Sequence, residues 1–182
     1  MASLTMGAWR IMAKAAAGAS ALTLSAPAMA EPTDTAVKAA FLPRFARYVT
    51  WPATAMPKGG DPFVLCVIGG DPFGAALDTA ARSQAVDGRR IVVRRMESTT
   101  AAETCQIAFV QGGKVQSGQA IAALAHRPVL TVTDASAGSQ RGMIHFAVVD
   151  GRVRFFVDQA SAAKRGLTIS SRLLALAIGV RQ

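Results

Sequence analysis

The most constraining feature of this 182-residue sequence is a series of short apolar runs, each followed by a turn or by a segment with helical spacing. The run PFVLCVIG contains no charged residue over its eight positions. A strand that is apolar along its whole length is usually covered on both faces, as in parallel sheets flanked by helices. The predicted strands are 62–69, 91–96, 105–111 and 128–134, and the predicted helices between them are 70–84 and 115–127. This alternation predicts an α/β fold with a mostly parallel sheet.

The C-terminal quarter has a different pattern. Residues 143–158 predict two strands around Asp150-Gly151, the strongest hairpin signal in the chain. A short helix over 159–166, closed by Gly166, follows. Residues 167–180 predict a final helix capped by Ser170 or Ser171; its apolar side would hold Leu173, Leu174, Leu176, Ala177 and Val180. We therefore expect a single-domain layered α/β fold: a mixed, mostly parallel sheet flanked by helices, with a C-terminal β-hairpin and a final helix.

The first helix is predicted over 34–50, where Phe41, Phe45 and other apolar residues recur three and four positions apart. Asp34 is a candidate cap, and Trp51-Pro52 ends the segment. Pro43 either kinks the helix or begins its second half, because an interior proline costs about 3 kcal/mol. The aromatic side chains either pack against the sheet or form a binding face, since aromatic residues are enriched among interface anchors.

The N-terminal 30 residues have the pattern of a cleavable secretory signal. Arg10 and Lys14 precede an alanine-rich apolar stretch, and Ala28-Met29-Ala30 supplies small residues for cleavage after Ala30. The pattern predicts a signal peptide over 1–30 and one domain over 31–182. No cysteine stands at the cleavage point and no run of 18 apolar residues follows it, so we expect a periplasmic protein without a spanning helix.

The charge balance is strongly basic: 20 Lys and Arg against 11 Asp and Glu give +9. Such a charge usually suggests nucleic acid, but an exported protein rarely meets nucleic acid, and we predict none as a partner. An anionic membrane or an acidic partner protein remains, with Arg94 and Arg95 as a candidate basic contact edge. A solvated strand edge guarded by charge explains the same cluster.

Two cysteines, Cys66 and Cys105, occur in the chain. In an exported protein this count favours a disulfide; the alternative is two buried free thiols. The sequence has no Cys or His pair with zinc-ligand spacing and no C-x-x-C motif. We therefore expect neither a metal centre nor thiol-exchange chemistry.

The sequence assembles no enzyme and implies no cofactor. The acidic residues are scattered singly, and no G-x-S-x-G accompanies His145, Asp134 and the nearby serines. The segment 69–74, GGDPFG, follows a strand and opens a helix, but it is neither G-x-G-x-x-G nor a P-loop. The carboxyl end of the sheet is still the default pocket position. The candidate pocket residues there are Gly70, Asp71, Phe73 and Asp134.

Taken in order, these segments resemble the YfiR-like family of small periplasmic proteins over about residues 35–178. The segments that carry the resemblance are VKAAFLPRFARYVTWP, FVLCVIGGDPFGAAL, VDGRRIVVRRM, CQIAFV, VLTVTD, GMIHFAVVDGRVRFFVD and AAKRGLTISSRLLALA. The resemblance implies a secreted, often dimeric α/β domain without catalytic activity. Cys66 and Cys105 match the positions that form a disulfide in the family, whereas the second cysteine pair of some members is absent. Pro43 departs from the family pattern.

The resemblance also implies a function and partners. Family members repress an inner-membrane diguanylate cyclase through its periplasmic domain, and an OmpA-type outer-membrane lipoprotein can sequester the repressor. We therefore expect a periplasmic regulator of cyclic-di-GMP, biofilm and motility. Its candidate contact residues are Phe41, Phe45, Arg47, Trp51, Arg94 and Arg95. The alternative is a small-ligand sensor that serves a membrane signalling protein such as a histidine kinase.

Overall fold

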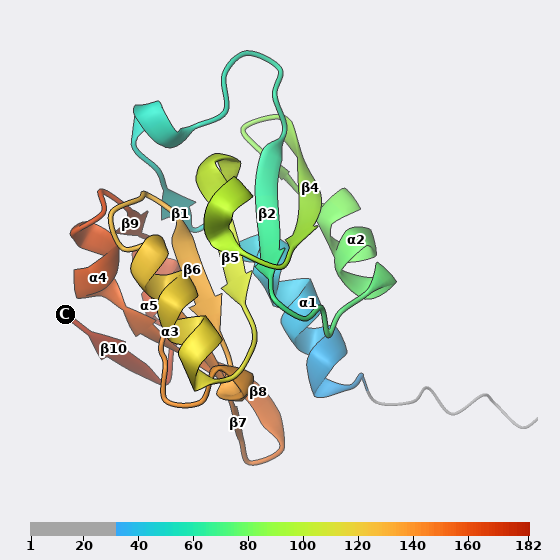
Figure 1. Cartoon of the computed structure of the whole chain (residues 1–182), viewed down its shortest axis with the longest axis vertical. Coiled ribbons are helices and arrows are strands. Elements are labelled where there is room, and N and C mark those ends of the chain that lie inside the picture. Colours follow the sequence, from blue (N-terminus) through green and yellow to red (C-terminus); the bar gives the residue numbers. More distant parts are fainter. Residues whose placement is uncertain (1–31) are drawn as a thin grey trace, which may run out of the picture. The chain divides into compact units, whose positions relative to one another are not determined.

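The computed structural model describes residues 32–182, so the predicted signal peptide lies outside the described residues. The described part contains an eight-stranded sheet in the order β10-β8-β7-β6-β5-β2-β4-β3 (Figure 1). Its strands are β2 (Phe63–Ile68), β3 (Ala85–Val86), β4 (Arg89–Met96), β5 (Ile107–Val110), β6 (Leu130–Thr133), β7 (Ile144–Val149), β8 (Arg152–Asp158) and β10 (Gly179–Arg181). A second, two-stranded sheet pairs β1 (Val49–Thr50) with β9 (Thr168–Ile169).

Helices cover this sheet on both sides. The α-helices are α1 (Asp34–Phe45), α2 (Ala75–Arg82), α3 (Lys114–Ala123), α4 (Gln159–Ala163) and α5 (Ser171–Leu174). The short 3-10 helices are η1 (Ala53–Ala55), η2 (Thr99–Thr104) and η3 (Ala135–Ala137). Helices α1 and α3 lie on opposite sides of the central strands (Figure 1).

The predicted mixed, mostly parallel sheet is confirmed. Strand β2 pairs in parallel with β4 and β5, and the series continues in parallel through β6 to β7. The hairpins β7–β8 and β3–β4 are antiparallel. All six side chains of β2 are buried, as its uninterrupted apolar sequence predicts for a strand covered on both faces.

Two apolar cores result, one on each face. On the first face, α1 and α2 pack Leu42, Phe45 and Leu77 against the sheet. On the second face, α3 packs Ala120 and then Leu124 against the alternate side chains of β2 and β5. The alternation of side chains along β2 produces this division, since successive side chains of a strand point to opposite faces of the sheet.

Asp-Gly turns close both hairpins. Asp150 and Gly151 both have positive φ, as do Asp87 and Gly88 between β3 and β4. Two positive φ values in a two-residue loop define the type I′ turn, whose twist matches that of the flanking strands. The hairpin predicted around Asp150-Gly151 is confirmed.

The first helix is shorter than the sequence predicts. Thr33, not Asp34, is its N-cap, and the Thr33 hydroxyl accepts from the Ala36 N–H at 3.2 Å. Pro43 lies in the last turn, where it has no N–H to donate to the carbonyl of Ala39, and the helix ends at Phe45. Val49 and Thr50 instead pair with β9. Pro43 therefore lies near the end of a single helix and begins no second half.

The final helix is also shorter than predicted over 167–180. Ser170 caps α5, but α5 spans only Ser171–Leu174. The Ile178 N–H then donates to the Phe155 carbonyl at 3.0 Å, and β10 continues in parallel beside β8. Backbone pairing with the open edge of β8 overrides the helical spacing of the leucines, a common outcome where tertiary contacts compete with local propensity.

Candidate functional site

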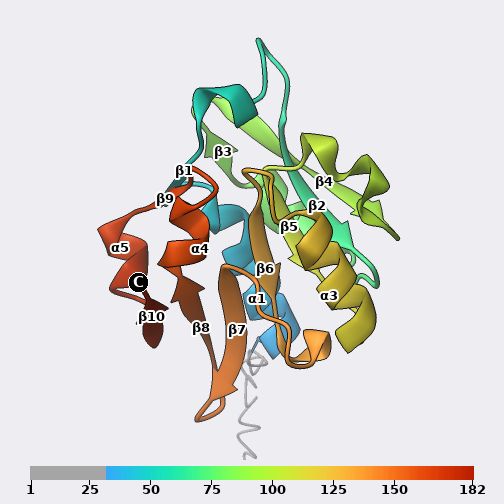
Figure 2. The same cartoon turned by 60° about the vertical axis from the view of Figure 1, so that its left-hand side comes forward.

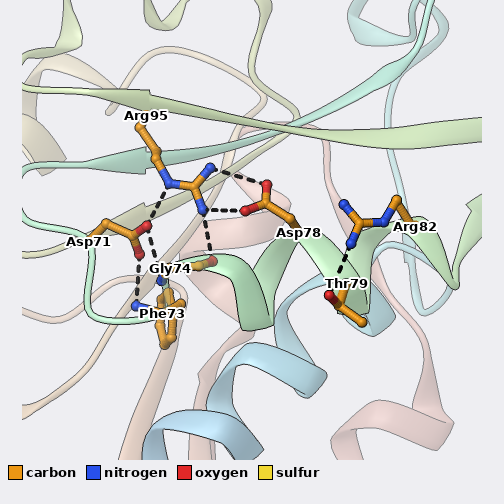
Figure 3. Close-up of polar contacts among 7 residues, drawn as sticks. All are labelled: Asp71, Phe73, Gly74, Asp78, Thr79, Arg82 and Arg95. Carbon is orange, nitrogen blue, oxygen red and sulfur yellow. Dashed lines mark hydrogen bonds and ion pairs between the residues drawn. The ribbon is translucent and has the colours of Figure 1, made fainter.

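Asp71 and Arg95, predicted for a pocket and for a contact edge, are joined in one cluster (Figure 3). The Asp71 carboxylate accepts from the N–H groups of Phe73 and Gly74 at 2.8 and 3.2 Å, and from the Arg95 guanidinium. The same guanidinium donates to both Asp78 oxygens at 3.1 and 2.8 Å, and to the Gly74 carbonyl at 2.9 Å. Arg95 of β4 is thus hydrogen-bonded to the start of α2 and to the turn before it.

The electrostatics agree with a structural role for this cluster. Partial burial would raise the pKa of Asp71, but its hydrogen bonds to Arg95, Phe73 and Gly74 outweigh burial and lower the pKa. The hydrogen bond from Arg95 likewise lowers the pKa of Asp78. Both carboxylates are therefore ionised and already engaged with Arg95. Phe73 lies below them, buried against Phe109 with ring centroids 4.8 Å apart.

Asp134 is engaged in a second cluster, at the end of β6. It forms a salt bridge of 2.7 Å with Lys38 of α1 and accepts from the Ser136 N–H and hydroxyl at 2.9 and 2.6 Å. Burial would raise the pKa of Asp134, but Lys38 and Ser136 lower it overall. Nearby, burial and the charge of Arg141 lower the pKa of His145 to about 4, so this histidine is neutral near pH 7.

Of the four predicted pocket residues, Gly70 lines a cavity of about 580 Å³. The cavity lies between the loops that follow β2 and β5, at the carboxyl ends of both strands. In the sheet, β4 lies on one side of β2 and β5 lies on the other. The order in which the chain adds strands to the sheet therefore reverses direction at β2. Ligands in open α/β sheets bind at such reversal points.

The walls of this cavity combine backbone and polar side chains with the apolar side chains of Ile68, Ala120 and Ala123. A side chain at Gly69 would collide with the Gln111 carbonyl oxygen, and Gly69 has φ +88°, so two loops can approach closely only with glycine here. The Oε1 atom of Gln111 is buried and accepts no hydrogen bond from any described residue. Further polar side chains in the lining are those of Glu97, Ser98, Thr99, Gln116 and Gln119. Sequence reasoning missed Gln111, although Gly112-Gly113 after β5 repeats the Gly69-Gly70 pattern after β2.

The predicted contact aromatics lie mainly in the core. Phe45 and Trp51 are 1% and 6% exposed, and the Trp51 indole N–H donates to the Gln106 carbonyl at 3.1 Å. Phe41 is half-buried and packs against Phe45, Phe146 and Phe155. The structure therefore favours the packing alternative for these rings.

Two of the six predicted contact residues present an exposed side chain outside the Asp71 cluster. Arg94 lies on β4 and donates to the Thr104 hydroxyl at 2.9 Å. Arg47 is exposed just after α1, beside a groove of about 350 Å³. Thr50, Trp51, Met56 and Asp87 also line this groove. The groove joins the end of α1 to the β3–β4 turn.

The predicted disulfide is confirmed: Cys66 of β2 is bonded to Cys105, just before β5, with Cα atoms 5.9 Å apart. Both cysteines belong to the second core, beneath α3. Within residues 32–182, no group of three His, Cys, Asp or Glu side chains could hold a metal ion. Among these residues, the helices are too short or too polar to cross a membrane.

A protein-family model described as YfiR/HmsC-like matches residues 35–178. The chain belongs to the YfiR/HmsC-like family. None of the curated proteins that were compared matches it. The YfiR/HmsC-like match spans the described fold from α1 to the residue before β10, so it includes the disulfide, the cavity and the groove.

Family membership gives the general role. YfiR/HmsC-like proteins are periplasmic, non-catalytic regulators, and membership supports a role for this chain in cyclic-di-GMP signalling together with a membrane signalling protein. A disulfide fits the oxidising periplasm.

Proposed function

We propose that this protein is a periplasmic repressor that binds the periplasmic domain of an inner-membrane diguanylate cyclase and lowers its output of cyclic-di-GMP. The observation that carries the proposal is the family match over residues 35–178, nearly the whole described chain. The carboxylates of Asp71, Asp78 and Asp134 are all held in internal ion pairs. This supports a binding role over catalysis, because none of the three carboxylates is free to act on a substrate.

The repressor acts by differential affinity. A protein that binds the inactive state of a receptor better than the active state shifts the receptor toward inactivity, whereas equal affinity shifts nothing. The groove beside Arg47 is our candidate contact. It offers an exposed cation at Arg47 and an exposed anion at Asp87, which would fix the orientation of a partner segment.

Two further assemblies belong to the proposal. An OmpA-type outer-membrane lipoprotein would relieve repression by competing for the repressor, and the repressor itself would work as a homodimer. Cross-linking and light scattering of the purified protein test the homodimer separately from the partner.

Complementation of a deletion strain tests the repressor directly. Deleting the gene should raise cellular cyclic-di-GMP, biofilm formation and surface attachment, and the wild-type gene should restore low levels. The variant Arg47→Ala should restore them poorly. Arg44→Ala is the matched control, because Arg44 is an exposed arginine three residues earlier that does not line the groove. Unchanged cyclic-di-GMP in the deletion strain would contradict the repressor, and equal complementation by both variants would contradict the groove.

Capture from detergent-solubilised envelope tests the partner and the role of the disulfide together. Recovery of a diguanylate cyclase by the oxidised protein, lost on reduction, would make the Cys66–Cys105 bond a requirement for repression. Recovery in both states would keep the repressor and make the bond purely structural. Failure to recover a cyclase in either state would favour the alternative function, a small-ligand sensor.

The alternative function is a small-ligand sensor. The 580 Å³ cavity at the strand-order reversal favours it, together with the buried, unpartnered Oε1 atom of Gln111. Gly70→Leu should fill this cavity, since a Cβ at Gly70 would meet only ordinary contacts. Gly60→Leu is the control, since a Cβ there meets open space. A ligand that raises the melting temperature of the wild type and Gly60→Leu, but not of Gly70→Leu, would support the sensor.

A further inference from the structure

The exposed large apolar side chains of the described residues are unevenly distributed. Seven are exposed, and six of them come from the last 35 residues of the chain. These six are Val148, Val149, Phe156, Leu176, Ile178 and Val180, exposed by 37–57%. The seventh, Val115 on α3, stands apart. Single exposed apolar residues are normal on a protein surface, but a concentration of this kind marks an interaction site.

Five of the six form one surface, which we call the C-terminal patch, whereas Val148 is paired with Val153 and points to the opposite face of the sheet. Val149, Leu176 and Ile178 line one shallow depression together with Arg152 and Arg154. Phe156 and Val180 line the adjoining depression with Arg141 and Arg181. The Ile178 N–H donates to the Phe155 carbonyl, so the loop after α5 lies directly beside β8.

The sheet is uncovered on this side. Arg152, Arg154 and Phe156 point to the same face of β8, opposite to the buried Phe155 and Val157, and all three are exposed. Figure 2 shows α1 behind the sheet, near β6 and β7, and α3 in front of the strands to the right of β7. The C-terminal patch is therefore an unpartnered sheet face together with the loop and hairpin at its end.

The same segment carries much of the basic charge. Residues 141–182 contain seven Lys and Arg against two Asp, a net charge of +5, whereas residues 32–140 contain eleven against eight. Asp158 pairs with Arg181 at 3.0 Å and accepts from the Ser161 N–H at 2.9 Å. Asp150 lines the depression of Arg152 and Arg154, so two arginines face one aspartate there and the surface keeps a positive charge. The partner of this patch must therefore offer an anionic surface with apolar groups close behind it.

A second copy of the chain does not meet this requirement, because a symmetric contact would bring the same arginines together. An acidic protein surface meets it less well than a lipid surface. The patch contains one aromatic residue, Phe156, among aliphatic side chains, and protein interface anchors are enriched in Trp and Tyr while Leu and Val are under-represented. We propose that the C-terminal patch docks this protein on an anionic phospholipid surface.

The geometry gives each residue type a part in this docking. Arg152 and Arg154 extend from alternate positions of β8, so their guanidinium groups can reach lipid phosphates while their aliphatic stems cover the sheet. Leu176 and Ile178, 57% and 42% exposed in the adjoining loop, can enter the boundary between headgroups and acyl chains. The proposal goes beyond repression and does not require a cyclase.

Vesicle co-sedimentation tests the docking with the purified protein and no other component. Vesicles of phosphatidylethanolamine with phosphatidylglycerol should bind the protein, and vesicles of phosphatidylcholine alone should bind it much less. Binding to the anionic vesicles should weaken as salt is raised, since exposed charges are screened.

Paired variants locate the surface. Arg152→Gln with Arg154→Gln should weaken binding to anionic vesicles about thirtyfold. Leu176→Ser with Ile178→Ser should weaken it about tenfold. The matched controls are Arg44→Gln with Arg90→Gln, which remove two exposed arginines outside the patch, and Val115→Ser, which removes the exposed valine of α3. Circular dichroism checks that each variant is folded.

Loss of binding in both patch variants, with binding kept in both controls, would support the docking. Equal affinity for anionic and neutral vesicles, or equal loss in the control variants, would overturn it. Patch variants that bind vesicles normally but no longer capture a cyclase or a second copy would overturn it too, and would reassign the patch to a protein interface.

Discussion

Removing the disulfide should cost this fold about 4 kcal/mol of unfolding free energy. The bond joins Cys66 and Cys105 over a sequence separation of 39. The loop that it closes contains α2, β3, β4 and η2, and therefore two strands at one edge of the sheet and one of the helices of the first core. For a loop of this length, the chain-entropy model gives about 4 kcal/mol of stabilisation at 25 °C, because the open unfolded chain gains conformations.

The native state adds a smaller contribution. Cys66 and Cys105 are 0% and 4% exposed in the second core, so Cys66→Ala with Cys105→Ala leaves a small void where the two sulfur atoms were. Such a void should cost about 1 kcal/mol more. A total of about 5 kcal/mol is a large part of the 5–15 kcal/mol that typically stabilises a domain. The double variant should therefore be marginally folded at 37 °C.

Urea unfolding followed by the fluorescence of the buried Trp51 measures this difference. The oxidised wild type, the reduced wild type and the double alanine variant are compared. The reduced wild type should lose about 4 kcal/mol, and reductant should leave the double variant unchanged. A loss below about 1 kcal/mol on reduction would refute the loop-closure reasoning.

Three further predictions concern stability. Arg95→Ala should lower the unfolding free energy by about 1 kcal/mol, because it leaves Asp71 and Asp78 without their shared partner, whereas Arg94→Ala should cost less in the same urea titration. Burial holds the pKa of His145 at about 4, below its ordinary 6.5. The unfolded chain therefore binds the proton first, so stability should fall by at most about 3 kcal/mol as pH drops from 6.5 to 4, and less to the extent that water reaches the ring. His145→Gln should remove this loss but keep the further loss below pH 4 that the lowered pKa values of Asp71, Asp78 and Asp134 predict. Gly69→Ala should cost about 1–3 kcal/mol because of its positive φ and the Gln111 carbonyl, and Gly70→Ala should be nearly neutral; thermal unfolding of the two variants decides.

The central fold was predictable because its signals are local. The uninterrupted apolar sequence of β2 implies burial on both faces, and Asp150-Gly151 supplies the positive φ values that a tight hairpin turn needs. These properties are set by a few adjacent residues, so they do not depend on contacts with the rest of the chain.

Both ends of the described domain were harder to predict because distant pairing decides them. The spacing of Leu173, Leu174 and Leu176 is helical, yet only the first two lie in α5, and the chain leaves the helix to pair with β8. Likewise, Val49 continues the apolar spacing of α1 but pairs with Ile169, more than a hundred residues away. A helical pattern does not show which strand edge is open.

The candidate site was only partly predictable for the same reason. Gly70 was found, because a glycine after a strand has a recognisable place in an α/β fold. The engagement of Asp71 depends on Arg95, which lies 24 positions further along the chain. The aromatic spacing from Phe41 to Trp51 is the same for a core face and for a binding face, and only packing against Phe146 and Phe155 distinguishes them.

The two proposed surfaces lie toward opposite ends of the domain, since β1 and β3 border the groove while the β7–β8 turn lies at the far end (Figure 2). No residue of the C-terminal patch lines the Arg47 groove, so a protein docked through the patch would leave the groove free for a partner. Docking restricts the search for a membrane partner to the membrane surface and raises the encounter rate without changing the groove. Arg152→Gln with Arg154→Gln should thus weaken repression in cells while its affinity for an isolated cyclase periplasmic domain stays that of the wild type, measured by titration calorimetry. Arg47→Ala should lose both. A patch variant that also binds the isolated domain more weakly would show that the patch touches the cyclase itself.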